Sequence, residues 1–595
     1  MPRSRLVACS VLVGLALAAA VLMPAAGAQE PEQPRTVRIA VNGYENNITP
    51  FNVSFAAFPV THDLMHLVHD SLFWSQAELE PEPWLAERAT PNEDFTEWTV
   101  ELRPGIRWHD GEAFTAEDVA FSFDYYERFP ELSGRYAHHV FDVPPVESAE
   151  VIDPQTVRLT FSQPAPQFPI MPGADLPIIA EHVWSEIEDP GTVDEELPIG
   201  TGPFKVTEIE PDERYVMEAN QQYFKGRPTV DRIEMPIVED PSAAFQALRA
   251  GQVDQVTRNL PPELVEQFSD AGDLEVVEGT RFESTQLYFN ARRAPWSDPA
   301  VRKAISLAID SQQLVDRVLL GQGRQGNDGF IHPDSPWAGQ NNGHETDPRR
   351  AERVLEEAGY NAGSDGIRRD GQGQPLRLEV LVSSFDPLGL RGVEQVARQV
   401  RPIGVEVVPV ALDPATLRDR RQAPEGEAPT YDAYLSTLET HAHADPDSLY
   451  YFFHSPGEGK GFGDAITGWS NERFDELSER AATQPPQERQ ALFDQMQSIL
   501  AEEAPVVVLW YPDGNYAYRS AAYDGWVSDP GQGIFTKRSF LPGYANTDAA
   551  GTVEDVGESS ALPWVAVGVA VLVVLAGVVA LRRRRTADAG EDWDG

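Results

Sequence analysis

Two short stretches of the sequence hold residue types that can do chemistry. His441, His443 and Asp445 alternate along an extended segment, so their side chains face the same way and two imidazoles could share one metal ion. Pro446 follows where a further ligand would be needed, so we assign no metal site. The second stretch, Trp-His-Asp-Gly at residues 108–111, lies between a predicted strand and a predicted helix, and we interpret it as a turn.

Other signals of catalysis are missing from the sequence. It contains neither Gly-x-Ser-x-Gly nor His-Glu-x-x-His, and its one cysteine, Cys9, excludes internal disulfides, cysteine nucleophiles and iron–sulfur sites. The 47 Lys and Arg residues are outnumbered by 94 Asp and Glu residues, which gives a net charge of −47 and argues against nucleic acid as a partner. We therefore predict a protein that is not an enzyme, with no catalytic residue and no cofactor. An extracellular hydrolase is the remote alternative.

Both ends of the chain carry patterns typical of targeting segments. Residues 1–28 combine Arg3 and Arg5 with an apolar stretch and a small-residue cleavage site, as in a secretory signal peptide. Residues 563–581 form an apolar run long enough to cross a bilayer, and four arginines follow it. We predict a single-pass cell-membrane protein with an extracellular or periplasmic ectodomain, a flexible linker over 546–562 and a cytoplasmic tail over 582–595.

Between these ends, strands alternate with helices, which predicts an α/β protein with a largely parallel sheet. Thr115 and Asp118 form a capping box before one predicted helix, and Asp298 with Pro299 begins another. The alternation is densest in the second half of the chain. Strands are predicted there at 376–382, 405–410, 433–438 and 506–511, and helices at 389–400, 414–421 and 486–503.

Six blocks of sequence are more specific than these patterns. The first is EWTVELRPGIRWHDGEAFTAEDVAFSF at residues 97–123. Five more follow in order along the chain: PIGTGPF (198–204), YFNARRAPWSDPAVRKAISLAIDSQQLV (288–315), DPDSLYYFF (445–453), GWSNERFDEL (468–477) and APVVVLWY (504–511). Together they resemble the extracellular solute-binding proteins of family 5, the oligopeptide-, dipeptide- and nickel-binding receptors of ABC importers.

This resemblance implies a periplasmic-binding-protein-like fold of two α/β lobes around a hinge, with an extra domain inserted in the first lobe. Lobe one would comprise 36–80, 196–288 and 507–545, the inserted domain 81–195, and lobe two 289–506. It also implies the function. The protein would capture peptides or similar small polar solutes between its lobes and deliver them to ABC permease subunits, and we expect a monomer.

Ligand-binding candidates come from loops at strand ends and from the resemblance. Asparagine side chains after the first strand suit a polar ligand, and the resemblance places ligand-facing aromatics at the end of the strand over 506–511. In peptide-binding relatives an aspartate that pairs with the peptide ammonium stands where this chain has Ala442, so Glu439 becomes the candidate replacement. The candidates are Tyr44, Asn46, Asn47, Glu439, Thr440, His441, His443, Trp510 and Tyr511.

Several alternatives remain open from the sequence alone. The asparagines also fit simple turns, and Trp510 and Tyr511 also fit a hydrophobic core. Stacking on Trp510 would suit an oligosaccharide, whereas His441 and His443 would suit a metal chelate. A surface sensor with the same fold is the other class of function that we weigh against an importer receptor.

Overall fold

The computed structural model describes most of the chain between residues 35 and 544. The predicted signal peptide over 1–28, the predicted linker and tail, and the apolar run over 563–581 lie outside the described residues, as do shorter internal stretches. The described residues are 35–41, 64–74, 81–129, 145–174, 176–188, 190, 197–210, 212–279, 282–339, 343–421, 428–439, 446, 450, 452–455, 467–529, 531 and 533–544.

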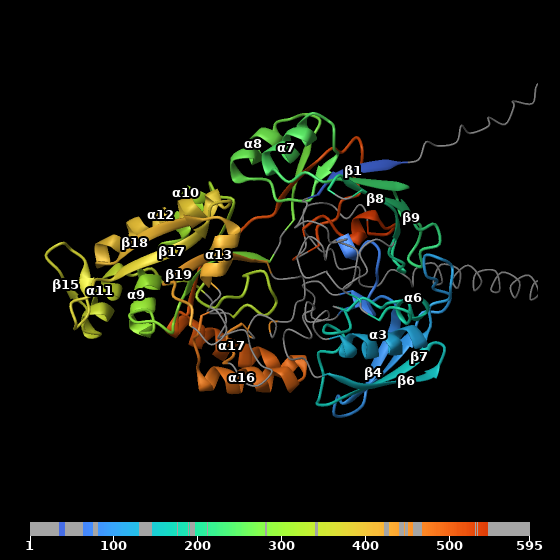
Figure 1. The fold of residues 1–595 in the computed structure, drawn as a ribbon, viewed down its shortest axis with the longest axis horizontal. Helices are drawn as coiled ribbons and strands as arrows, with labels where there is room; N and C mark the ends of the chain where they lie inside the picture. The colour runs from blue at the N-terminus through green and yellow to red at the C-terminus, as the bar shows by residue number, and fades with distance from the viewer. Residues whose placement is uncertain are drawn as a thin grey trace, which may run out of the picture. The chain divides into compact units, whose positions relative to one another are not determined.

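The first of three main sheets collects strands from both ends of the described chain. Its order is β12 (Glu275–Glu278), β21 (Asn515–Tyr518), β11 (Gln255–Val256), β1 (Thr36–Ala40), β10 (Arg232–Pro236), β9 (Arg214–Ala219) and β8 (Phe204–Glu210). β1 pairs in parallel with β10 and β11, and its side chains alternate between two hydrophobic clusters. The helices α7 (Pro241–Arg249) and α8 (Pro262–Ser269) cover one of these faces (Figure 1).

A separate antiparallel sheet forms the inserted unit. Its strands run in the order β4 (Ala86–Pro91), β5 (Glu97–Leu102), β7 (Thr156–Phe161) and β6 (Val146–Asp153), and α3 (Ala116–Arg128) packs beside them (Figure 1). The predicted capping box begins α3, because the Asp118 carboxylate accepts a hydrogen bond from the backbone N–H of Thr115 at 2.9 Å. This unit has a hydrophobic cluster of its own.

The second large sheet runs in the order β14 (Gly323–Gln325), β20 (Val506–Pro512), β13 (Glu283–Phe289), β19 (Ala433–Glu439), β17 (Arg377–Ser383) and β18 (Glu406–Leu412). β17 is parallel to β18 and β19, as the alternation predicted. β13, however, pairs antiparallel with β19 and β20, and β14 with β20, so the sheet is mixed. The reason is that β13 brings the chain in from the first sheet and β20 takes it back, so these neighbouring strands run in opposite directions.

Helices cover both faces of the second sheet. One face packs on α9 (Pro299–Ala308), α10 (Ser311–Val318), α11 (Pro348–Glu357) and α12 (Pro387–Val400). The other packs on α13 (Pro414–Arg421), α16 (Glu472–Thr483) and α17 (Pro486–Glu503) (Figure 1). Asp298 caps α9 as predicted, and its carboxylate accepts from the N–H of Ala300 at 2.9 Å.

Two connections join the large sheets, and they run side by side. One follows β12 and the other follows β20. The N–H of Gly279 donates to the carbonyl of Gly514 at 2.6 Å, and a Cβ on Gly514 would lie only 1.8 Å from the carbonyl oxygen of Gly279. Glycine is therefore required where the two backbones touch.

The chain passes from one large sheet to the other at residues that differ from the predicted lobe boundaries. We expected lobe two to cover 289–506, but β13 begins at Glu283 and β20 ends at Pro512, and both belong to the second sheet. The expected boundaries fell inside these strands because the sequence shows where a strand lies but not which sheet it joins.

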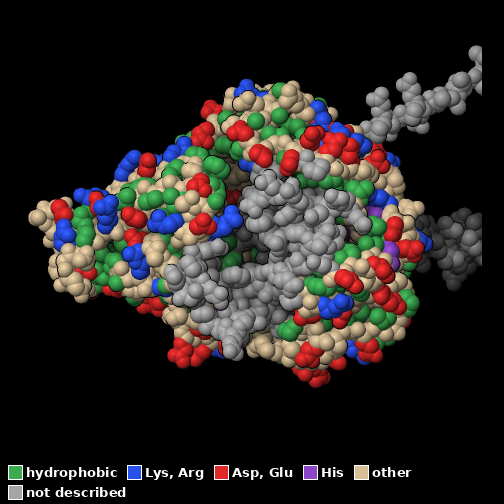
Figure 2. Space-filling view, viewed as in Figure 1, with side chains coloured by type: hydrophobic (Ala, Val, Ile, Leu, Met, Phe, Trp, Pro, Cys, Tyr) green, Lys and Arg blue, Asp and Glu red, His purple; other side chains and the backbone are tan. Residues whose placement is uncertain are grey.

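The predicted single-pass membrane topology is corrected. Among the described residues, no helix is both long enough and apolar enough to cross a bilayer. The tether and cytoplasmic tail therefore form no part of the function proposed below. Acidic and basic side chains are interspersed over the described part of the face drawn in Figure 2.

Candidate functional site

Most of the predicted ligand-binding residues fall outside the described part of the chain. These are Tyr44, Asn46, Asn47, Thr440, His441 and His443, and Ala442 lies among them. Glu439 ends β19, where its backbone pairs with Glu283, but its side chain is not described. The structure therefore does not test these residues, and they stay predictions.

Trp510 and Tyr511 are described, and both side chains are buried in hydrophobic clusters of the second lobe. Trp510 packs against α12 so closely that a Cβ at Gly392 would lie 2.4 Å from the indole. The Tyr511 hydroxyl donates to the carbonyl of Ile331 at 3.2 Å, and its ring meets His332 edge-on. Both residues lie on β20, which has neighbours on each side and cover on each face. Packing is thus their observed role, and contact with a ligand stays a prediction.

The Trp-His-Asp-Gly stretch is a turn, as interpreted from the sequence, and it docks on the PIGTGPF block. His109 donates from Nε2 to the carbonyl of Gly202 at 3.0 Å and accepts at Nδ1 from the N–H of Gly200. Burial lowers the pKa of His109 to about 4, so the ring is neutral at physiological pH. The backbone of Val68 lies so close to both glycines that neither position has space for a Cβ. Two of the family-like blocks are therefore structural partners.

A pocket of about 460 Å³ lies between the inserted unit and the second lobe, and we call it the bridging pocket. Its walls are mainly aromatic and proline side chains. The rings of Trp98 and Phe168 lie 5.3 Å apart at an angle of 49°, and Trp337 meets Phe493 of α17 edge-on at 5.0 Å. The lining side chains are Phe73, Pro81, Pro83, Glu87, Arg88, Ala89, Pro91, Trp98, Pro166, Gln167, Pro169, Ile170, Trp337 and Arg489.

Arg489 lies in this lining with its guanidinium over the Trp337 ring at 5.5 Å, and two uncharged side chains there each have a polar atom without a hydrogen-bond partner among the described residues. These atoms are the carboxamide oxygen of Gln167, from the inserted unit, and the indole N–H of Trp337, from the second lobe. Both side chains are 3% exposed. A buried polar atom without a partner costs on the order of 1–3 kcal/mol, and a bound ligand can remove that cost. By contrast, the indole N–H of Trp98 donates to the carbonyl of Ala165 at 3.1 Å.

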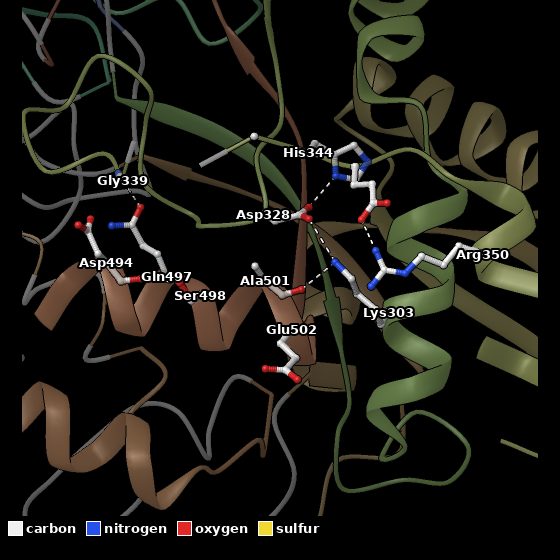
Figure 3. Close-up of a pocket in the computed structure, with 12 residues that line it drawn as sticks. Lys303, Asp328, Gly339, His344, Arg350, Asp494, Gln497, Ser498, Ala501 and Glu502 are labelled. Carbon is white, nitrogen blue, oxygen red and sulfur yellow. Dashed lines mark hydrogen bonds and ion pairs between the residues drawn. The ribbon is translucent and has the colours of Figure 1, made fainter. Parts of the chain in front are cut away.

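A second cavity, of about 750 Å³, lies within the second lobe between α9, α11 and α17 (Figure 3). We call it the charged cavity, because lysine, arginine, histidine and carboxylate side chains line it. Figure 3 shows these groups bonded to one another: Lys303 to Asp328 at 3.2 Å, Asp328 to His344 at 2.6 Å, and Arg350 to Glu345. The lysine, histidine and arginine of this wall are therefore each paired with a carboxylate.

His344 is the centre of this network. Its Nδ1 faces the Asp328 carboxylate, and its Nε2 faces the carbonyl of Ile309 at 2.7 Å. Both partners only accept hydrogen bonds, so the ring must donate from both nitrogens and carry a proton on each. Burial alone would lower the pKa of His344, but the hydrogen bond to Asp328, the charge of Asp328 and the bond to the carbonyl of Ile309 together outweigh it and raise the pKa above 6.5. Burial would raise the pKa of Asp328, and the same bond with the charge of Lys303 holds it below its ordinary value.

The bridging pocket could hardly be predicted from the sequence. Gln167 lies in QPAPQFP (163–169), whose prolines keep the segment out of regular helix or sheet. This proline-rich segment was the one sequence feature that pointed to an irregular surface there. It does not reveal that Trp337 lines the same pocket. Within the described ranges, no cluster of three His, Cys, Asp or Glu residues is placed to hold a metal ion. The His441–Asp445 string lies outside those ranges.

Two α/β lobes joined by paired connections, with a pocket between the inserted unit and the second lobe, define a solute-binding protein in architecture. Comparison with known proteins identifies the family. Residues 80–460 match the model of the bacterial extracellular solute-binding proteins, family 5. The chain belongs to this family, so the resemblance drawn from the six blocks is confirmed. Because its relatives are solute-binding proteins, the prediction that the chain is not an enzyme is also confirmed.

Three individual proteins illustrate the similarity. The nickel-binding periplasmic protein of Escherichia coli (strain K12) is 26% identical over 469 residues, covering 75% of this chain and 84% of its own length. Protein XP55 of Streptomyces lividans is 29% identical over 486 residues, covering 81% and 83%. The structure of the oligopeptide-binding protein AppA from Bacillus subtilis, in complex with a nonapeptide, has a TM-score of 0.70 at 21% identity, covering 86% of this chain and 99% of AppA.

Proposed function

We propose that this chain is the substrate-binding subunit of an ABC importer, and that it captures peptides or similar small polar solutes and delivers them to the permease. A secretory signal at residues 1–28 is part of this proposal. The observation that carries it is the bridging pocket, because a ligand held there would contact the inserted unit and the second lobe at once. Family membership supports the transport role.

The paired connections support a hinge mechanism. Two thin crossings that touch at Gly279 and Gly514 allow one lobe to rotate on the other without breaking either sheet. Arg391 of α12 pairs with Glu263 of α8 at 2.5 Å, which is a second contact between the lobes. A ligand that contacts both lobes favours the closed arrangement over the open one, and the closed form would dock on the permease.

A thermal-shift assay on the full chain tests this function. The ligands are a peptide pool, an oligosaccharide pool and nickel with histidine, each at low and high salt. A ligand present at about a hundred times its Kd stabilises the folded state by roughly 2.7 kcal/mol. We expect the peptide pool to raise Tm. A shift with sugars or nickel–histidine alone would support the receptor function but change the ligand that we propose. No shift with any of the three would contradict the receptor function.

A further inference from the structure

Two uncharged side chains of the bridging pocket offer one hydrogen-bond acceptor and one donor, set in mainly apolar walls whose charged members are Glu87, Arg88 and Arg489. The acceptor is the Gln167 carboxamide oxygen and the donor is the Trp337 indole N–H, and neither has a partner among the described residues. They come from opposite sides of the pocket, since Gln167 belongs to the inserted unit and Trp337 to the second lobe. A ligand that satisfies both atoms must therefore touch both parts of the protein.

The second-lobe wall of the pocket is built around Trp337. Trp337 is held by its edge-on contact with Phe493 and by its carbonyl, which accepts from Gln497 at 3.2 Å and from Gln490 at 3.4 Å. The volume of about 460 Å³ falls in the range of roughly 300–1,000 Å³ that is usual for ligand sites. The arrangement of the inserted unit and the second lobe therefore sets which ligand the pocket fits.

The chemistry of the wall favours a peptide unit with an apolar side chain. A peptide group carries one N–H donor and one C=O acceptor, which match the carboxamide oxygen and the indole N–H. The prolines, Phe73 and Trp98 would bury an apolar side chain. A sugar would leave most of its hydroxyls without partners against such walls. Neither histidine nor cysteine is among the residues that line the pocket, which disfavours a metal ion.

We propose that the bridging pocket is a specificity subsite for an uncharged peptide segment, with an apolar side chain buried against Trp98 and backbone hydrogen bonds to Gln167 and Trp337. This inference rests on the proposed function and narrows its cargo. The peptide would join the inserted unit to the second lobe, so the subsite also gives the inserted unit a part in ligand recognition.

Calorimetry on the full chain tests the side-chain preference. The probes are tetrapeptides of the form Ala-Ala-Xaa-Ala, with apolar, aromatic or charged residues at Xaa. We expect the aromatic and large aliphatic members to bind tightest and the charged members weakest. Tightest binding by charged members would overturn the inference.

Two variants test the pocket itself, with a matched control. Trp337→Phe removes the unpartnered N–H and keeps the apolar ring, and Gln167→Leu removes the carboxamide. Trp526→Phe is the control, because its buried indole N–H also has no partner among the described residues but lies in the first lobe. We expect each pocket variant to weaken binding of the tightest tetrapeptide by roughly 3- to 10-fold, and the control to stay within about twofold.

Neither pocket variant removes a hydrogen bond that the described fold makes, so Tm should be retained and a loss of affinity would report on the ligand. Unchanged affinity in both variants would overturn the subsite and leave the receptor function standing. If the unmodified protein binds only oligosaccharides or nickel–histidine, the peptide inference fails although the chain is still a receptor. Binding of none of these probes would contradict the proposed function as well.

Discussion

The two cavities of this protein differ in how their polar groups are satisfied. The charged cavity is the larger, at about 750 Å³, and its lysine, histidine and carboxylate groups bond to one another. The bridging pocket is smaller, at about 460 Å³, and two of its polar atoms lack partners among the described residues. A larger cavity with more charge is thus the weaker candidate for ligand binding. What distinguishes a site for a ligand is the bonding capacity that the fold leaves unused.

The contrast predicts that the charged cavity contributes to stability. The largest expected effect is that of Asp328→Ala, which would leave the buried cations Lys303 and His344 without their shared partner. Loss of one partner of a buried ion pair costs about 3–5 kcal/mol, so we expect a clearly lower urea midpoint with unchanged ligand affinity. A variant that kept its stability but lost ligand affinity would reverse the roles of the two cavities.

A second prediction concerns pH. The pKa of His344 is raised above 6.5 in the folded protein, so its contribution to stability is complete below pH 6.5 and is lost as the pH rises through the folded-state pKa. Asp328, Lys303 and the Arg350–Glu345 pair are the charged groups around it. We expect His344→Gln to lower stability at pH 6 by roughly 1–3 kcal/mol, the usual contribution of a charged hydrogen bond.

The control for this prediction is the slope of stability against pH. The unmodified protein should lose stability from about pH 6.5 upward, whereas the variant should show a flatter profile in the same range. Urea unfolding at a series of pH values measures both. Parallel profiles would contradict the doubly protonated ring.

A smaller difference in stability is expected between two tryptophan variants of the bridging pocket, because one indole N–H has a hydrogen-bond partner and the other has none among the described residues. Trp98→Phe removes the indole hydrogen bond to the carbonyl of Ala165, which keeps only its bond from the N–H of Phe168, and should cost about 1 kcal/mol of stability. Trp337→Phe removes an N–H that has no described partner and should change stability by less than about 0.5 kcal/mol. Urea midpoints of the two variants give the comparison. Equal losses would show that Trp337 has a partner within the fold.

The smallest expected effect is at the rim of the charged cavity. Glu502 lines it but is exposed to solvent, so Glu502→Gln should alter the free energy of unfolding by no more than about 0.5 kcal/mol. The variant is also the matched control for Asp328→Ala, since both remove a carboxylate from the same wall. A loss as large as that of Asp328→Ala would mean that the whole wall acts as one network.

The sequence alone determined the elements and the family. Sequence patterns were sufficient where a structure depends on residues a few positions apart. The capping box at Thr115 and Asp118, the Asp298–Pro299 helix start, and the helix over 486–503 all lie where they were predicted. The six sequence blocks, in their order along the chain, were enough to identify the family. A turn such as PIGTGPF accepts few residue types, because neighbouring backbone leaves no space for side chains at its glycines. The His109 interpretation also stood, since its partners are backbone groups.

Only the tertiary structure decided which strands share a sheet and which side chains face a cavity. β13 and β20 belong to the second sheet although each is joined directly to a strand of the first, and Trp510, a predicted ligand residue, is packed against Gly392. Gln167 and Trp337 are far apart in sequence and meet at one pocket because the inserted unit and the second lobe come together there. Hydrophobic burial is non-directional, so a sequence shows that an aromatic residue will be covered but not what will cover it.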